Sequence, residues 1–135
     1  MWIEPKTNWK STDKINFSDY NRIKNNISYL RDIALTLYSD FPWNNMGADK
    51  NSYVQYPYAD EFNNLENNLV LLRNYTYAFY SGNAKTWYEN QRTPNFEDLN
   101  RLEGACLKMY NGLNLQADMR ERLAFRLGDA KQIKV

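Results

Sequence analysis

Histidine is absent from this sequence of 135 residues, which limits the chemistry that its side chains could do. Without it, Ser–His and Cys–His nucleophile pairs, His-ligated zinc sites and a His general base are excluded. Carboxylates remain as acids and bases, but they fall mostly at expected helix starts and on polar faces, and the five glycines form no phosphate-binding loop. We therefore expect no enzyme and no catalytic, cofactor-binding or metal site.

The single cysteine, Cys106, is the remaining candidate nucleophile. It stands where two similar segments of the same chain carry Ile27 and Leu69. A small apolar residue in a core is therefore the favoured interpretation, ahead of a reactive or redox-active thiol. No disulfide can form within one chain.

Aromatic side chains are the strongest candidates for binding. The loop from Phe41 to Ala59 mixes Asn, Gly and Pro with aromatic residues, an uncommon composition for a passive connector. Its flat apolar rings could contact a sugar or a partner protein, and two tryptophans lie in the aperiodic arm of residues 1–15. Alternatively, the loop aromatics cover a helix bundle. These candidate contacts are Trp2, Trp9, Trp43, Tyr53, Tyr56 and Tyr58.

The elements that must position these residues follow from an internal repeat. One pattern of acid, large apolar residue, Asn, polar residue, Ile or Leu, and charge occurs at residues 19–24, 61–66 and 98–103. Further apolar residues follow each copy at steps of four and three, which is typical of a helix with one buried face. The sequence thus predicts a mainly α protein with three similar amphipathic helices, within residues 16–40, 60–81 and 95–111.

The same pattern predicts where the helices begin. Asn16 with Asp19, and Asn95 with Asp98, have the spacing of an N-cap and a reciprocal third helical position. The second copy lacks such a pair, and Asp60 is expected to cap it instead. The shared residues Asn21, Asn63 and Asn100 are interpreted as solvated or capping side chains.

The last segment, residues 112–135, is predicted to leave the helical pattern. Asn111 and Gly112 should end the third helix. Met119, Leu123 and Leu127 fit a helix, but strict alternation over residues 122–127, with Gly128 as a stop, favours a short strand. An unpaired strand needs a partner, which could be the N-terminal arm or another subunit.

Length and charge limit the class of protein further. The chain can bury one ordinary core, so we expect a single helical domain. Its 17 basic and 16 acidic residues give no electrostatic reason to bind nucleic acid or a membrane surface. We also find no membrane-spanning stretch and no secretory signal, so synthesis in the cytosol is expected.

Three segments carry a resemblance to a known group of proteins: residues 5–9 (PKTNW), Asp19 to Leu30, and Trp87 to Glu103. They resemble small virion proteins and tail-fibre leader segments of phages and prophages of Gram-positive bacteria. The resemblance implies a structural part of the tail, baseplate or an appendage, present in several copies and made in the host bacterial cytoplasm. Many such segments precede a long fibre, whereas this sequence stops at Val135, which favours a small connector or decoration protein.

Three hypotheses about function follow. The first is a non-enzymatic virion assembly protein that forms a homo-oligomer and contacts other virion proteins. The second is a recognition module that binds carbohydrate or cell wall, with a cell-surface glycan as its ligand. A small enzyme that uses paired carboxylates is the third, and a deep cleft with facing acids would favour it.

Overall fold

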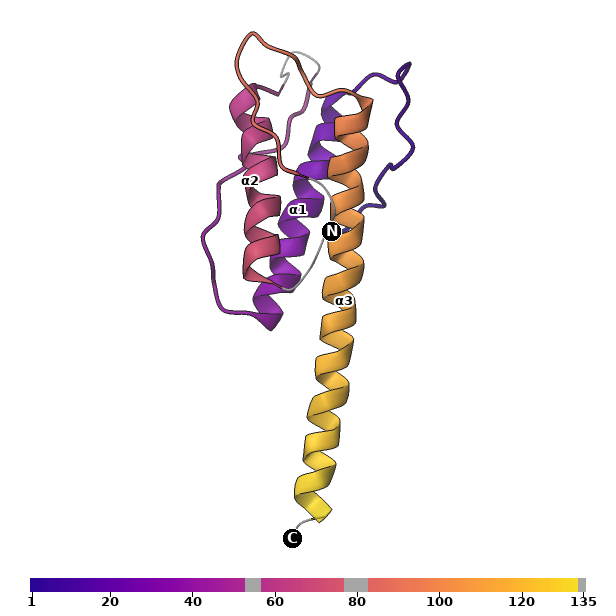
Figure 1. The fold of residues 1–135 in the computed structure, drawn as a ribbon, viewed down its shortest axis with the longest axis vertical. Coiled ribbons are helices and arrows are strands. Elements are labelled where there is room, and N and C mark those ends of the chain that lie inside the picture. Colours follow the sequence, from indigo (N-terminus) through magenta and orange to yellow (C-terminus); the bar gives the residue numbers. More distant parts are fainter. Residues whose placement is uncertain (53–56, 77–82, 134–135) are drawn as a thin grey trace.

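The computed structural model describes residues 1–52, 57–76 and 83–133, with side chains described as far as residue 126. Three helices pack against one another: α1 (Phe17–Leu37), α2 (Ala59–Tyr75) and α3 (Phe96–Ile133). They run in the same direction, so each connection must return to the end at which the next helix begins (Figure 1). The described residues contain no strand. The expected mainly α architecture with three helices is confirmed.

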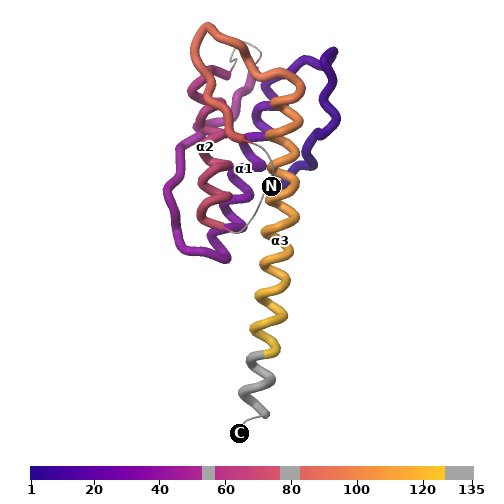
Figure 2. The backbone as a smooth tube through the Cα atoms, viewed as in Figure 1, coloured from indigo at the N-terminus to yellow at the C-terminus, as the bar shows by residue number. Residues whose placement is uncertain are grey.

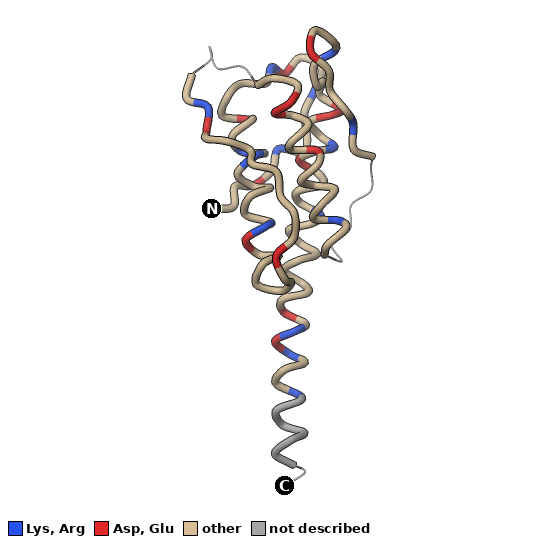
Figure 3. Tube along the Cα trace, turned by 90° about the vertical axis from the view of Figure 1, so that its left-hand side faces the viewer, with Lys and Arg blue, Asp and Glu red and all other residues tan. Residues whose placement is uncertain are grey.

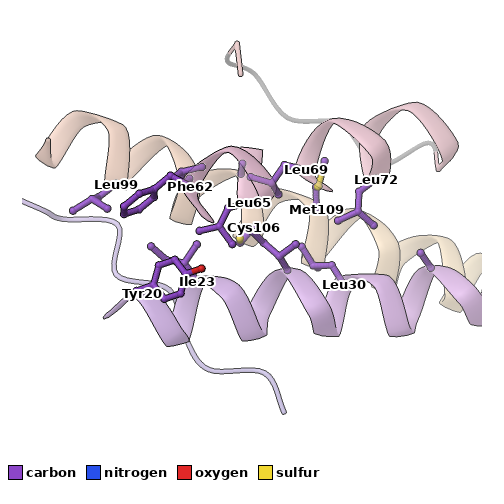
Figure 4. Packing of buried hydrophobic residues seen from close by; sticks show 14 of the residues in the cluster. Tyr20, Ile23, Leu30, Phe62, Leu65, Leu69, Leu72, Leu99, Cys106 and Met109 are labelled. Atoms are coloured by element: carbon purple, nitrogen blue, oxygen red, sulfur yellow. The ribbon is translucent and has the colours of Figure 1, made fainter. Parts of the chain in front are cut away.

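The core is built from equivalent positions of the three repeats. Ile23, Leu65 and Leu102 hold the same place in each copy, and all three are fully buried. The next two sets of equivalent residues are also fully buried, namely Ile27, Leu69 and Cys106, then Leu30, Leu72 and Met109. Figure 4 shows Leu30, Leu69 and Met109 in the same cluster as Ile23 and Leu65. Burial of these side chains supplies the main driving force for bundling the helices.

Two of the three predicted helix starts have the expected caps. Asn16 accepts a hydrogen bond from the backbone N–H of Asp19 (3.1 Å), and Asp19 accepts one from Asn16 (3.0 Å). Asn95 and Asp98 make the same reciprocal pair at 3.0 Å each. The prediction for α2 was wrong: Tyr58 is its N-cap residue, and Asp60 lies in the first turn.

The predicted end of the third helix and the predicted strand over residues 122–127 are both wrong. α3 continues through Asn111 and Gly112 to Ile133. Leu113, just beyond the expected stop, is fully buried. A glycine inside a helix costs only about 1 kcal/mol, which burial of a leucine exceeds.

α3 is much longer than its two companions. It has 38 residues, against 21 in α1 and 17 in α2, and its second half extends alone beyond the bundle (Figure 2). Tyr38, at the end of α1, donates a hydrogen bond from its hydroxyl to the Gln116 side chain of α3. We call residues 114–133 of α3 the stem.

Candidate functional site

Asparagine side chains hold the extended segments against the helices. Asn100 of α3 accepts a hydrogen bond from the backbone N–H of Trp9 (2.8 Å) and donates one to the carbonyl of Trp9 (3.0 Å). The equivalent residues Asn63 and Asn21 make the same pair of bonds with Trp87 and Lys50, at 2.6–2.9 Å. The prediction that these asparagines are solvated or capping is therefore wrong.

A second asparagine, five residues further along, repeats this contact on two helices. Asn26 of α1 pairs in the same way with Ile3 (2.7 and 2.9 Å), and Asn68 of α2 pairs with Asn44 (2.9 Å for both bonds). Two of the three bound segments therefore bridge two helices, since residues 3–9 join α1 to α3 and residues 44–50 join α2 to α1. The third copy has Ala105 at this position.

Two buried carboxylates complete this arrangement. Glu103 accepts hydrogen bonds from the indole N–H of Trp9, the backbone N–H of Lys6 (3.0 Å) and the Arg22 guanidinium (2.7 Å). Its counterpart Glu66 accepts from the indole of Trp87 (3.4 Å) and from Arg101 (2.9 Å). All of these donors belong to the same chain. The hydrogen bonds of Glu103 and Glu66 therefore hold the fold together.

The first copy replaces this carboxylate with a lysine. Lys24 is buried, pairs with Asp49 (2.5 Å) and donates to the Gly47 carbonyl (3.2 Å). The hydrogen bonds that Asp49 receives from Lys24 and Asn25 outweigh the effect of burial and hold the pKa of its carboxyl below the usual value. The loop that lies against α1 is thus held by an ion pair where the other two copies use a tryptophan and a glutamate.

The two tryptophans of the N-terminal arm lie against their own chain. Trp9 is buried in the core cluster. Trp2 stacks on Tyr110 of α3, with ring centroids 4.0 Å apart and an interplanar angle of 5°. These contacts pin the arm against the helical body.

The two loop aromatics that the structure describes among the candidate contacts, Trp43 and Tyr58, lie at different places. Trp43 is half-buried, contacts Phe41 edge to face, and has the Arg31 guanidinium 5.2 Å from its ring centroid. It borders a pocket of about 410 Å³, whose other lining residues include Lys24 and Asn25. Tyr53 and Tyr56 lie outside the described residues.

Tyr58 contributes to a different pocket, which we call the aromatic pocket. It has a volume of about 430 Å³ and lies between the start of α2 and the connection that precedes α3. Phe62 and Trp87 are its buried aromatic residues, while Tyr58 and Tyr88 are 68% and 62% exposed. Residues 89–94 complete it, among them Asn90 with a left-handed φ of 60°.

The stem carries a second unpartnered apolar surface. Leu115, Met119 and Leu123 are 59%, 59% and 58% exposed, and their spacing of four residues places them on one side of the helix. We call them the stem ridge. Charges of both signs lie around the ridge (Figure 3), including an ion pair of 3.2 Å between Arg122 and Asp118.

Reactive groups are scarce in the part of the chain that the structure describes. Cys106 is buried in the core, as expected, and burial raises the pKa of its thiol. Within the described ranges, no three His, Cys, Asp or Glu side chains are placed to hold a metal ion. Nor does any described helix have the length and apolar character needed to cross a membrane.

Both exposed sites include residues that sequence reasoning missed. Tyr88 lies in the second connection, beside Trp87, which was noted only as the first residue of a segment that resembles virion proteins. The spacing of Leu115, Met119 and Leu123 was a usable helix signal, but Leu123 was assigned to a strand. Their exposure could not be read from spacing, because buried and exposed helix faces can have the same period.

Comparison of the chain with protein-family models, with curated proteins and with solved structures gives no match.

Proposed function

We propose that this chain is a non-enzymatic structural protein of a phage or prophage virion, acting in several copies as a connector in the tail, baseplate or an appendage. The main support is the stem, which leaves the bundle as a single helix and exposes three large apolar side chains. An apolar ridge of this kind is typical of a surface that binds another protein. The resemblance of residues 5–9, 19–30 and 87–103 to virion proteins supports the choice of particle.

The body has the properties of a rigid spacer. Five asparagines hold extended segments against helices through paired backbone hydrogen bonds, and Glu66 and Glu103 are saturated by donors from the same chain. Such a body can hold the stem in a fixed orientation. We propose that the body sets the position of each copy while the stem makes the contact between proteins.

The test is the content of purified particles. Particles from the producing host are separated on a density gradient, and the chain is quantified against a major virion protein by mass spectrometry. A constant copy number across the particle peak is expected. Absence from intact particles, in a host that synthesises the chain, would overturn the proposal.

A second candidate function rests on the aromatic pocket, which fits recognition of a cell-surface glycan. Tyr58 and Tyr88 expose flat rings, and polar side chains of residues 89–93 lie beside them, a combination that suits a sugar. Binding of cell-wall polysaccharide fragments by the full chain, followed by tryptophan fluorescence, tests it. Loss of binding in Tyr58→Ala with Tyr88→Ala is expected, while Phe125→Ala, an exposed aromatic on the stem, should bind normally. No binding by the unmodified chain would reject this candidate.

A further inference from the structure

The two sides of the stem ridge differ. On one side, Arg120 lies over the Tyr38 ring, 4.7 Å from its centroid, and donates to the carbonyl of Leu37. Gln116, on the same side, accepts the Tyr38 hydroxyl. On the other side lie Asp118 and Arg122, whose side chains are 52% and 75% exposed. This second side is therefore open to a partner, whereas the first is partly covered by the end of α1.

We propose that the stem ridge binds the stem ridge of a second copy in antiparallel orientation, with the two helices crossing at Met119. This inference rests on the proposed function in multiple copies and names the partner of the stem. Side chains four residues apart form a ridge, and two such ridges pack into each other's grooves when helices cross. A twofold axis at Met119 then places Leu115 of each copy against Leu123 of the other.

Charge complementarity selects the antiparallel orientation. With the axis at Met119, the open side of one stem faces the open side of the other, so Asp118 lies within reach of Arg122 of the second copy, and the reverse pair forms as well. In a parallel pair, the open side would instead meet the side that carries Arg120. Arg120 would then lie between Asp118 and Arg122 of the other copy, so its attraction to the acid is offset by repulsion from the base. The parallel pair therefore gains less from charge than the antiparallel pair, which forms two Asp118–Arg122 contacts.

The arrangement of the body agrees with this orientation. The bundle surrounds the first half of α3, and the stem extends away from it on one side only (Figure 1). Antiparallel stems place the two bodies at opposite ends of the pair. Only three ridge residues per copy are buried, so the dimer is expected to be small in area and to depend on protein concentration.

Disulfide trapping in the full chain tests the orientation. The buried Cys106 is first replaced (Cys106→Ala), and single cysteines are then introduced as Leu115→Cys, Met119→Cys or Leu123→Cys. Under mild oxidation, Met119→Cys alone should form a covalent dimer. Leu115→Cys and Leu123→Cys should form one only when mixed with each other. A covalent dimer of Leu123→Cys alone, at the yield of the mixture or above, would overturn the antiparallel arrangement.

Light scattering coupled to size-exclusion chromatography tests whether the stem ridge is the surface through which the chain dimerises. The unmodified chain should show a mass that rises from monomer to twice that value with concentration. Replacing all three ridge residues by Ser should keep it monomeric, with an unchanged circular dichroism spectrum. Phe125→Ser, the matched control, changes an even more exposed apolar residue off the ridge and should still dimerise. A monomer at every concentration for the unmodified chain would overturn the inference.

These results separate the inference from the proposed function. A chain that stays monomeric in solution but has a constant copy number in particles contradicts only the antiparallel dimer. A trapped antiparallel dimer that is absent from particles contradicts only the virion role.

Discussion

Asn63 and Trp87 are 24 residues apart in the sequence, yet the side-chain amide of Asn63 satisfies both backbone hydrogen-bonding groups of Trp87, at 2.7 and 2.9 Å. The amide acts as a neighbouring strand would, because it offers one donor and one acceptor to an extended residue. Asn21 and Asn100 do the same for their own bound segments. Within the described ranges, extended segments are thus bound to helices through side-chain amides, without a sheet.

The first prediction concerns this contact. Asn63→Ala should lower the free energy of unfolding by about 2 kcal/mol, since it leaves a partly buried N–H and C=O of Trp87 without partners. Urea unfolding at equilibrium measures the change. The control is Asn67→Ala on the exposed face of the same helix, which should change it by less than about 0.5 kcal/mol. Equal effects of the two substitutions would show that the paired bonds contribute nothing.

Much of the helical architecture could be predicted from the sequence because local signals and burial agree there. Asn16 with Asp19 and Asn95 with Asp98 cap their helices by contacts within one turn, and such contacts depend on spacing alone. The apolar period of each copy likewise marked Ile23, Leu65 and Leu102 for the core. These features can be predicted without knowing which residues from distant parts of the chain lie nearby.

The remaining features depend on contacts that spacing does not reveal. The role of Asn100 is set by Trp9, 91 residues away, and nothing in its local sequence separates a solvated asparagine from one that binds a backbone. The prediction of where α3 ends was wrong for a related reason. Packing of Leu113 in the core outweighs the local tendency of Asn111 and Gly112 to end a helix. The aromatic pocket joins two connections that only the fold brings together.

A second prediction tests the equivalence of the three core positions. Replacing Ile23, Leu65 or Leu102 by Ala should each cost about 2 to 5 kcal/mol, because every one of these side chains is fully buried. Thermal and urea unfolding give the values. Leu35→Ala, at an exposed position of α1 away from the stem ridge, serves as the control and should cost under about 1 kcal/mol. A cost below that of the control at two of the three positions would contradict the shared core role.

A third prediction concerns the ion pair between Arg22 and Glu103. Arg22→Ala should destabilise the protein by about 3 to 5 kcal/mol, because it leaves the buried Glu103 carboxylate with neutral donors only. Adding Glu103→Gln should recover part of this loss by removing the charge. Asp40→Ala breaks an exposed pair with Arg31 and should cost about 1 kcal/mol or less. If the double variant is no more stable than Arg22→Ala, the buried charge is not the cause.

A fourth prediction concerns acid stability. Burial raises the pKa of the Asp98 carboxyl, but hydrogen bonds from Lys85 (2.5 Å) and from the backbone of Asn95 (3.0 Å) outweigh it, and the net pKa is lowered. A lowered native pKa stabilises the fold above the unfolded pKa, and that contribution disappears as pH falls through the native pKa. The stability difference between the unmodified chain and Asp98→Asn should therefore be constant near neutral pH and shrink below about pH 4.

Chemical denaturation at a series of pH values measures that difference. Glu97→Gln, a change to an exposed acid in the same helical turn, is the matched control and should show no comparable pH dependence. A difference for Asp98→Asn that stays constant down to about pH 2.5 would mean that the carboxyl has the same pKa in the folded and unfolded chains.

The last prediction concerns Tyr20, whose hydroxyl is buried and has no hydrogen-bond partner among the described residues. Burial, together with the carboxylates of Glu61 and Asp60, raises the pKa of this phenol, so the group stays neutral and its lost hydration is uncompensated. Tyr20→Phe removes the hydroxyl but keeps the ring, which meets Phe62 edge to face at 5.7 Å. The variant should therefore be more stable by about 1 kcal/mol, whereas Tyr88→Phe at an exposed site should be neutral. Urea unfolding of both variants decides the matter, and a loss of stability in Tyr20→Phe would mean that the hydroxyl has a partner after all.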